Sequence, residues 1–345
     1  MASKKKKQRK ALRSALIVGC VVMGLVFALM LTATVYAEYL LGRLNYFPSI
    51  HRENLTWEEA EKLLQQETDP EEENYTGRED NADDVANEVA GVVLPTSENV
   101  INILLIGADY QSGDMARSDS MILCTFNKTR NTITMTSFMR DMYVQIPGYY
   151  KNKINASYTI GGMDLLQKTL NHNFGVQVSG IVEVDFSQFE KLVDLLGGVE
   201  IELNRQEAEF INLKSGSKLT AGLHNLTGEQ ALWYSRNRGD ARGDFNRTNR
   251  QRVVLSKLIE NYRSVSMTEL IAMLDDILPM VTTNMTKHEI ISYVTGLFPM
   301  LVGAEIVTQQ IPAEGGYYQT RIDGKSVLVP DISFNIEILK NTITE

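Results

Sequence analysis

Residues 14–37 limit the architecture of this chain more than any other feature, because they carry no charged side chain. Leu, Val, Ala and Met dominate the segment, and a helix of this length, rising ~1.5 Å per residue, crosses a hydrocarbon core of ~30 Å. The preceding residues 1–13 carry basic charges and no acidic ones, which predicts that they stay in the cytoplasm. We therefore expect a basic cytoplasmic tail over 1–13, a single transmembrane helix over 14–37, and an extracellular remainder held at the cell membrane.

Two other interpretations of this segment remain open. Val35-Tyr36-Ala37 is compatible with signal peptidase cleavage, which would release the protein, although the apolar run is long for a cleaved signal. The residues around Cys20 resemble a lipoprotein acylation box, but few apolar residues precede that cysteine. The other cysteine is Cys124, so the sequence offers no intramolecular disulfide framework.

Residues 38–99 are predicted to form an acidic tether that is largely disordered. Between Glu53 and Glu98 the bases are Lys62 and Arg78, while acids are frequent and large apolar residues are few. Residues 55–66 could form a short helix close to the membrane. The tether would separate the membrane segment from a folded domain that begins near residue 100.

Apolar strand patterns and helical patterns alternate over residues 100–345. Strands are predicted at 100–110, 118–127 and 132–139, with a hairpin turn at 127–131, and residues 180–203 predict a strand, a helix and a strand. Helices are predicted at 161–175, around 226–237, up to about 263, and in three later segments, with a strand at 304–312. The alternation predicts one α/β domain with a central mixed sheet and helices on both faces.

Six arginines and no lysine lie in residues 235–252, although the chain has a formal net charge of −9. Arginine stays charged and binds phosphate oxygens bidentately. On a helix beginning near Asp244, the side chains of Arg247, Gln251, Val254 and Leu258 share one stripe. The stripe is polar at its start and apolar further along, which favours a wall that faces a polar head group and an apolar chain. The alternative is a half-buried helix whose arginines pair with nearby acids.

Charged residues also stand at the predicted strand ends. Asp109 lies in a Gly-Ala-Asp loop that ends the first strand, Arg117 and Asp119 open the second strand, and Arg140 closes the third. Ligands of open α/β sheets bind beyond strand ends, so we expect these residues to converge. Paired aspartates offer the hard oxygen ligands that Mg²⁺ takes together with substrate phosphates. The aspartates and arginines together predict a magnesium–pyrophosphate site.

Six segments, in order, resemble the motifs of the LytR-CpsA-Psr family: NILLIGAD, RSDSM, TSFMRD, KINASYTIGG, LTGEQALWYSRNR and GDFNRTNRQR. The resemblance covers about residues 100–263. It implies a phosphotransferase that moves a glycopolymer from undecaprenyl pyrophosphate to peptidoglycan, typically to the C6 hydroxyl of N-acetylmuramic acid, through a phosphodiester bond. Two positions depart from the family pattern: Met139 stands where proline is frequent and Asn246 where a small residue is frequent.

The resemblance also implies a role for each matching residue. Asp109 and Asp119 would hold Mg²⁺, and the identity of the general base stays open between Asp119, Asp244 and other aspartates. The prenyl chain needs an apolar slot, for which Val254, Leu255, Leu258 and residues 182–196 are candidates. Pyrophosphate binding is expected from Arg117, Arg140, Arg236, Arg238, Arg247 and Gln251, and catalysis from Asp119, Arg140, Arg236, Arg238 and Asp244.

Two other functions remain compatible with the sequence. A polyprenyl-pyrophosphate hydrolase would use the same groups, because water and a sugar hydroxyl attack the same phosphorus. A cell-surface regulator without catalytic activity is the second. Nucleic-acid binding is disfavoured, because the basic tail is short and the predicted domain lies outside the cell. The polymer, of the teichoic acid or capsular type, stays undetermined.

Overall fold

The computed structural model of the chain describes residues 39, 42, 45–46, 56–65, 78–82, 85, 91–112, 115–239, 243–263 and 265–343. The predicted tail 1–13 and membrane segment 14–37 lie outside these residues. Among the described helices, none combines the length and hydropathy that a bilayer crossing requires.

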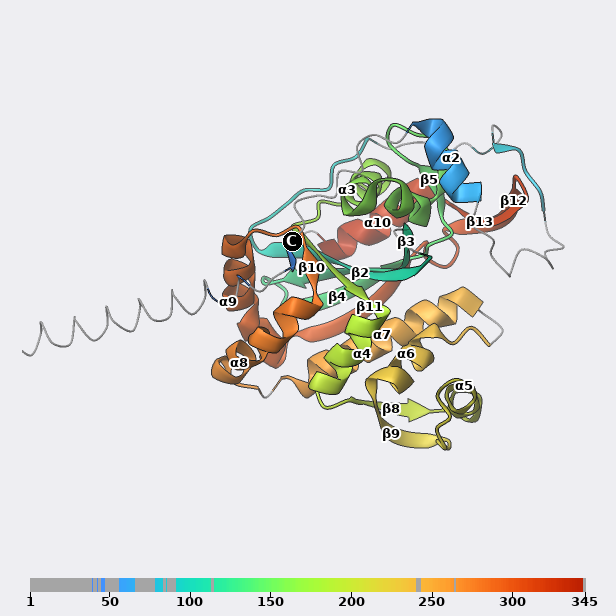
Figure 1. Cartoon of the computed structure of the whole chain (residues 1–345). Coiled ribbons are helices and arrows are strands. Elements are labelled where there is room, and N and C mark those ends of the chain that lie inside the picture. The colour runs from blue at the N-terminus through green and yellow to red at the C-terminus, as the bar shows by residue number, and fades with distance from the viewer. Residues whose placement is uncertain are drawn as a thin grey trace, which may run out of the picture.

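A seven-stranded mixed sheet forms the centre of the molecule (Figure 1). The strand order is β1 (Asn45–Tyr46), β10 (Thr282–Thr283), β7 (Gly180–Asp185), β2 (Val100–Ser112), β3 (Met115–Asn127), β4 (Thr132–Phe138) and β11 (Glu305–Ile311). Strands β2, β3 and β4 form an antiparallel meander, while β7 runs parallel to β2, and β11 runs parallel to β4. As a result β2, β4, β7 and β11 all end at the same edge of the sheet, where β3 begins.

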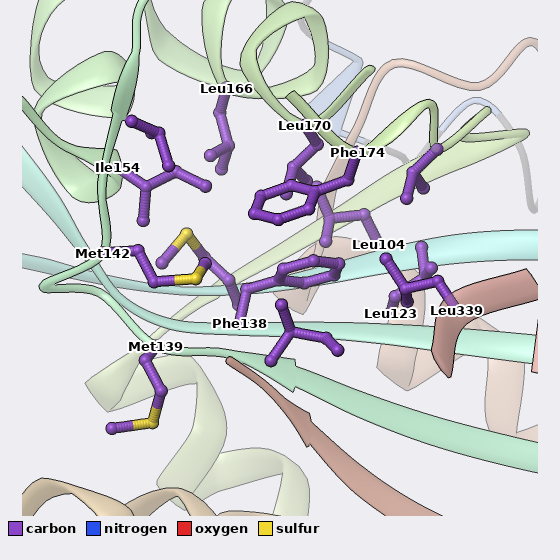
Figure 2. Packing of buried hydrophobic residues seen from close by; sticks show 14 of the residues in the cluster. Leu104, Leu123, Phe138, Met139, Met142, Ile154, Leu166, Leu170, Phe174 and Leu339 are labelled. Atoms are coloured by element: carbon purple, nitrogen blue, oxygen red, sulfur yellow. The ribbon is translucent and has the colours of Figure 1, made fainter. Parts of the chain in front are cut away.

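One face of the sheet packs under α3 (Ile154–Phe174) and α10 (Ile332–Ile343), which lie above it in Figure 1. Alternation along the strands turns every second side chain toward this face. Figure 2 shows Leu104 and Leu123 of the sheet below these helices, and the rings of Phe138 and Phe174 have centroids 5.8 Å apart. This cluster is the main core of the molecule.

The opposite face packs against α7 (Gly243–Asn261) and α9 (Lys287–Gly303). Ile122 and Cys124 point this way and contact Leu255 and Ile259 of α7. Ile101, Ile103 and Ile133 meet the apolar side of α9. Helices therefore cover both faces, which confirms the predicted α/β fold with a central mixed sheet.

A smaller unit follows β7 and carries one wall of the site described below. It consists of α4 (Phe186–Leu195), β8 (Val199–Leu203), α5 (Arg205–Ser215), β9 (Gly222–Leu226) and α6 (Gly228–Arg236), with β8 and β9 antiparallel. Capping boxes begin all three helices, at Asp185, Asn204 and Thr227. The apolar sides of these elements close on Val254 and Leu258 of α7.

Two further features differ from the sequence-based expectation. The helix predicted at 161–175 begins at Ile154, because two helical pieces join across non-helical backbone at Gly161 and Gly162. The described parts of residues 38–99 pack on the domain: α2 (Trp57–Gln65), which lies within the helix considered at 55–66, places Ala60 and Leu64 against the α3 side. The sequence did not predict α5, β9 or two hairpins. These hairpins are β5–β6 (Tyr143–Gln145, Lys151–Lys153) and β12–β13 (Tyr317–Ile322, Lys325–Pro330). Helix α8 (Met267–Ile277) and a short 3₁₀ helix, Leu278–Met280, precede β10.

Candidate active site

A β-bulge in β3 directs Asp119 into the site. Gly107 of β2 pairs with Ser120 of β3. The next residue of β2, Ala108, pairs with Ser118, so Asp119 is an extra residue with no pairing partner in β2. Consecutive residues of a regular strand face opposite sides of the sheet, but bulges re-aim side chains. Asp119 and Ser120 consequently line the same cleft.

Asp109 lies inside a strand rather than in the Gly-Ala-Asp loop that the sequence predicted, whereas Arg117 lies near the start of β3, as expected. β2 continues to Ser112, and Asp109 pairs with Arg117 of β3 across the ladder. The prediction of a loop after the first strand was wrong because the glycine and alanine before Asp109 continue the hairpin. Both residues nevertheless lie at the sheet edge where β2 ends, as expected.

A buried carboxylate ties the end of β2 to its neighbours. Glu183 of β7 accepts hydrogen bonds from the hydroxyls of Tyr110 and Tyr158, each at 2.5 Å. Burial and the Glu183 carboxylate raise the pKa of Tyr110 to about 12, so this hydroxyl stays protonated at neutral pH. Tyr110 directly follows Asp109, so the bonds to Glu183 hold the segment that carries the aspartate.

Arg140 lies just after β4 and joins three aspartates. Its Nη1 donates to Asp119 Oδ1 at 3.0 Å, and its Nε lies 3.4 Å from Asp141 Oδ2 and 3.7 Å from Asp244 Oδ1. Its side chain is 7% exposed. A buried guanidinium of this kind needs neighbouring carboxylates to compensate the loss of water. Arg140 therefore links the sheet edge to α7.

The first turns of α7 supply three predicted residues. Arg247 Nη2 lies 2.7 Å from Asp244 Oδ1 and donates to the backbone carbonyl of Asp119 at 3.2 Å. Gln251 accepts a hydrogen bond from the Ser120 hydroxyl at 3.0 Å. The polar start of the predicted stripe therefore contacts both residues at the bulge.

Arg236 and Arg238 come from the end of α6 and the segment after it. Arg236 Nη2 lies 3.9 Å from Asp109 Oδ2, and its guanidinium stands 4.3 Å from the Phe186 ring centroid. Arg238 Nε lies 3.8 Å from Asp244 Oδ1. Both side chains are 29% exposed, so they remain more accessible than Arg140 and Arg247.

These residues surround a cleft of about 510 Å³. Of the predicted residues, Asp119, Arg236, Arg238, Arg247 and Gln251 line it. The remaining predicted residues, Asp109, Arg117, Arg140 and Asp244, are outside its lining, although three of them form ion pairs with residues of the cleft. The other lining residues are Ser120, Phe186, Phe210, Lys214, Trp233, Ser235 and Gly239.

The neighbouring arginines keep Asp119 ionised. Burial alone would raise the pKa of Asp119, but the charges of Arg140 and Arg247 outweigh it and hold that pKa below its usual value of 3.8. Burial lowers the pKa of Arg247 to about 10 against the opposing effect of Asp244. Both groups therefore carry their charge at neutral pH.

Two arginines of the same stretch are structural. Arg250 Nε donates to Glu207 Oε1 of α5 at 2.9 Å, and its Nη1 donates to the carbonyl of Asn237 at 2.9 Å. Arg252 donates to the Ser137 hydroxyl of β4 at 2.7 Å. The alternative of a half-buried helix with paired arginines thus applies to Arg250. Arg242 lies outside the described residues.

Most of the residues predicted to form an apolar slot for the prenyl chain lie outside the cleft. Val254 and Leu258 are buried against β8 and α6, and Leu255 packs on the sheet, so none of the three lines the cleft. The apolar half of the stripe attaches α7 to the rest of the fold. From residues 182–196 Phe186 does line the cleft, where it forms an aromatic wall with Phe210 and Trp233.

Sequence reasoning missed three polar residues. Asp141 and Lys153 form an ion pair at 3.0 Å beside Arg140, and Ser120 anchors Gln251. Burial opposes ionisation of Asp141, but Arg140 and Lys153 hold its pKa below the usual value. Their positions in the TSFMRD, KINASYTIGG and RSDSM segments were the available signal.

The donor chemistry of the sheet edge fits Mg²⁺. Asp109 and Asp119 offer carboxylate oxygens, which this ion prefers. Within the described ranges, no group of three or more His, Cys, Asp or Glu side chains could enclose a metal ion. A magnesium ion held by Asp109 and Asp119 would therefore complete its coordination with phosphate oxygens and water.

The sequence model of the LytR_cpsA_psr family matches residues 62–343 of this chain. The regulatory protein MsrR of Staphylococcus aureus is 39% identical over 172 residues, which cover 49% of this chain and 52% of MsrR. The chain thus matches about half the length of MsrR. TagU of Bacillus anthracis, a polyisoprenyl-teichoic acid–peptidoglycan teichoic acid transferase, is 33% identical over 267 residues, covering 74% of this chain and 86% of TagU.

Solved structures of TagT share the fold. TagT bound to LIIa-WTA superposes with a TM-score of 0.61 at 29% identity, covering 74% of this chain and 94% of TagT. TagT, also called YwtF, with bound octaprenyl pyrophosphate lipid gives a TM-score of 0.57 at 26% identity, covering 75% and 97%. TagT is a Bacillus subtilis protein.

Proposed function

The chain belongs to the LytR_cpsA_psr family, and we propose that it transfers a glycopolymer from a polyprenyl-pyrophosphate carrier to peptidoglycan. The carrier in the cell is undecaprenyl pyrophosphate, and the polymer is of the teichoic acid or capsular type. The domain acts at the outer face of the cell membrane, anchored by residues 14–37. TagU, named as a teichoic acid transferase, and TagT with its bound octaprenyl pyrophosphate support the proposal.

One observation carries it. Guanidinium groups from three separate segments pair with the aspartates of the site. Arg140 after β4 pairs with Asp119, and Arg236 at the end of α6 pairs with Asp109. Arg238 after α6 and Arg247 in α7 both pair with Asp244. Arginines match phosphate oxygens geometrically, and a diphosphate carries the charge that such a cluster neutralises. The aspartates hold the cluster together before substrate binds.

The reaction replaces one phosphorus–oxygen bond by another. The acceptor hydroxyl of peptidoglycan attacks the phosphorus next to the glycan, and the bond from this phosphorus to the bridging oxygen breaks. Polyprenyl monophosphate leaves, and the hydroxyl proton passes to a base. The protein's part is to align donor and acceptor and to neutralise charge on the phosphate oxygens. Arg236, Arg238 and Arg247 line the cleft and provide this neutralisation.

Buried Arg140 orients the cluster. Its three aspartate contacts fix the guanidinium at the sheet edge, and the pairing with Asp119 keeps that carboxylate ionised. Asp244 holds both Arg238 and Arg247. When bound to Asp109 and Asp119, Mg²⁺ would supply further neutralisation of the phosphate oxygens.

A reconstituted transfer assay tests the proposal. The full chain in lipid nanodiscs is given Mg²⁺, a labelled polyprenyl-pyrophosphate glycopolymer and peptidoglycan, and wall-attached label is measured. We expect transfer that is lost with EDTA and in Asp119→Ala, and is reduced at least about 100-fold in Arg140→Ala. Arg205→Ala is the matched control, because Arg205 pairs with Glu209 on the exposed side of α5.

The products distinguish the alternatives. Free monophosphorylated polymer without wall-attached label would identify a hydrolase and contradict the transferase. Donor binding without turnover would support the regulator. Full activity of Asp119→Ala in the presence of EDTA would contradict the magnesium site alone.

A further inference from the structure

Lys214 stands at the α5 side of the cleft, far in sequence from every predicted site residue. Its Nζ lies 5.6 Å from the centroid of the Trp233 ring and 5.9 Å from that of Phe210. Both rings line the cleft together with Lys214. Cations at this distance are attracted to aromatic faces, so the two rings hold the ammonium group at the cleft wall.

The helix that carries Lys214 is fixed to the rest of the site. The capping box of Asn204 and Glu207 begins α5, and the same Glu207 pairs with Arg250 of α7. Figure 1 shows α5 beside α6 on the lower side of the molecule. Lys214 is therefore attached through a buried ion pair to the helix that presents Arg247 and Gln251.

The charge of Lys214 is not neutralised within the described part of the protein. The arginines of the site have aspartates within 4 Å, as the pairs of Arg140, Arg236 and Arg247 show. No ion pair joins Lys214 to any described carboxylate, and its ammonium group lies near the two aromatic rings. The α5 wall of the cleft, formed by Phe210 and Lys214, thus carries a positive charge that no described carboxylate pairs with.

Lys214 and Arg236 border the same indole ring. The Arg236 guanidinium carbon lies 5.5 Å from the Trp233 centroid, close to the 5.6 Å of Lys214. A ligand whose pyrophosphate meets Arg236 therefore reaches Lys214 with the part adjoining the pyrophosphate. A prenyl chain gains nothing from an ammonium group, because burying a charge against hydrocarbon is unfavourable. The α5 wall suits the glycan end of the donor.

We propose that Lys214 is a specificity residue that binds an anionic group, a carboxylate or a phosphate, on the glycan close to the pyrophosphate. The inference rests on the proposed function and concerns the sugars next to the pyrophosphate of the same donor. The apolar faces of pyranose rings contact Trp233 and Phe210, while Lys214 forms a charge-assisted hydrogen bond with the anion.

Three synthetic donors test this inference with the full chain in nanodiscs. Each is an octaprenyl pyrophosphate disaccharide whose second sugar is neutral, a uronic acid or a sugar phosphate. We expect the wild-type KM to be about tenfold lower for the charged donors, which is the effect of one charge-assisted hydrogen bond. Lys214→Met reduces this preference to about twofold or less, and Lys214→Arg retains it. Lys218→Met is the control, because Lys218 is exposed and lies outside the cleft lining.

Each outcome decides the role of Lys214. If the uronate and phosphate donors differ, the preferred one identifies the anion. Equal KM values for neutral and charged donors in the wild type, or equal losses for all donors in Lys214→Met, overturn the inference. A loss that follows prenyl length instead of glycan charge assigns the α5 wall to the lipid and also overturns it. If no donor is transferred, the proposed function fails. The role of Lys214 is then decided by equilibrium affinities, which are compared between charged and neutral donors in the wild type and in Lys214→Met.

Discussion

Replacing Glu207 by Ala tests whether the arginine-rich stretch is held from α5. Glu207 and Arg250 form an ion pair at 2.9 Å, with side chains only 10% and 8% exposed. Removing one partner of a buried pair leaves the other charge unpaired and costs about 3–5 kcal/mol. Glu207 also closes the α5 capping box with Asn204, which adds about 1 kcal/mol. We expect a loss of about 4–6 kcal/mol in the free energy of unfolding.

Thermal and urea denaturation of the full chain measure this loss. A domain of this size should unfold about 10–20 °C lower in Glu207→Ala. Glu207→Gln is the matched control, because glutamine keeps the capping-box acceptor and loses only the charge, so its loss should be smaller. Arg250 also donates a hydrogen bond to the carbonyl of Asn237, which directly precedes Arg238. In Glu207→Ala we therefore expect the segment that carries Arg238 to be held less firmly, and the affinity for prenyl pyrophosphate to fall.

A double variant decides the cause. In Glu207→Leu with Arg250→Met, both charges are replaced by apolar side chains, which should recover most of the loss from the single change. The reasoning is refuted if Glu207→Ala costs less than about 1 kcal/mol, or if the double variant is no more stable than Glu207→Ala.

Three further changes have defined outcomes. Gly228→Ala places a Cβ 2.0 Å from the backbone oxygen of Glu190, so α6 must separate from α4; thermal unfolding should show a loss of about 2 kcal/mol, and an unchanged Tm would disprove this close approach. Glu183→Gln removes a negative charge near the Tyr110 hydroxyl, so its pKa of about 12 should fall, as ultraviolet titration reports; an unchanged titration would count against the contact. Asp141→Asn removes a carboxylate whose pKa is lowered in the folded state. The stabilisation from this carboxylate is present above the unfolded pKa of 3.8 and is lost as the pH falls through the folded pKa. The free energy of unfolding should therefore depend less on pH below about 4 in the variant than in the wild type, and equal slopes would contradict the lowered pKa.

The sequence predicted the sheet edge because strand ends and charged residues coincide there. Apolar runs before Asp109 and Arg140 set the strands, and their antiparallel order brought those residues to the edge where β7 also ends. The arginine content of residues 235–252 predicted an anion site, and three arginines of this stretch, Arg236, Arg238 and Arg247, line the cleft. Spacing alone could not separate Arg247, which lines the cleft, from Arg250, which pairs with α5.

Other parts of the site depend on contacts between elements, which the pattern of residues along the sequence does not show. The bulge at Asp119 exists only relative to β2, and without it alternation would turn that aspartate toward the opposite face. Helix α5 has few apolar positions, and Ala208 and Ile211 alone of these are buried, so its pattern gave no helix prediction. Lys214 and Phe210 lie on α5, so the sequence analysis missed them for the same reason.

The central claim is that arginines from three segments bind one diphosphate. Isothermal titration of the full chain with octaprenyl pyrophosphate, and with octaprenyl monophosphate for comparison, measures this directly. Arg140→Met, Arg236→Met and Arg247→Met should each bind the pyrophosphate at least about tenfold more weakly than the wild type, while Arg205→Met should bind it equally well. Wild-type affinity in all three site variants, with their folds intact by circular dichroism, would contradict the claim.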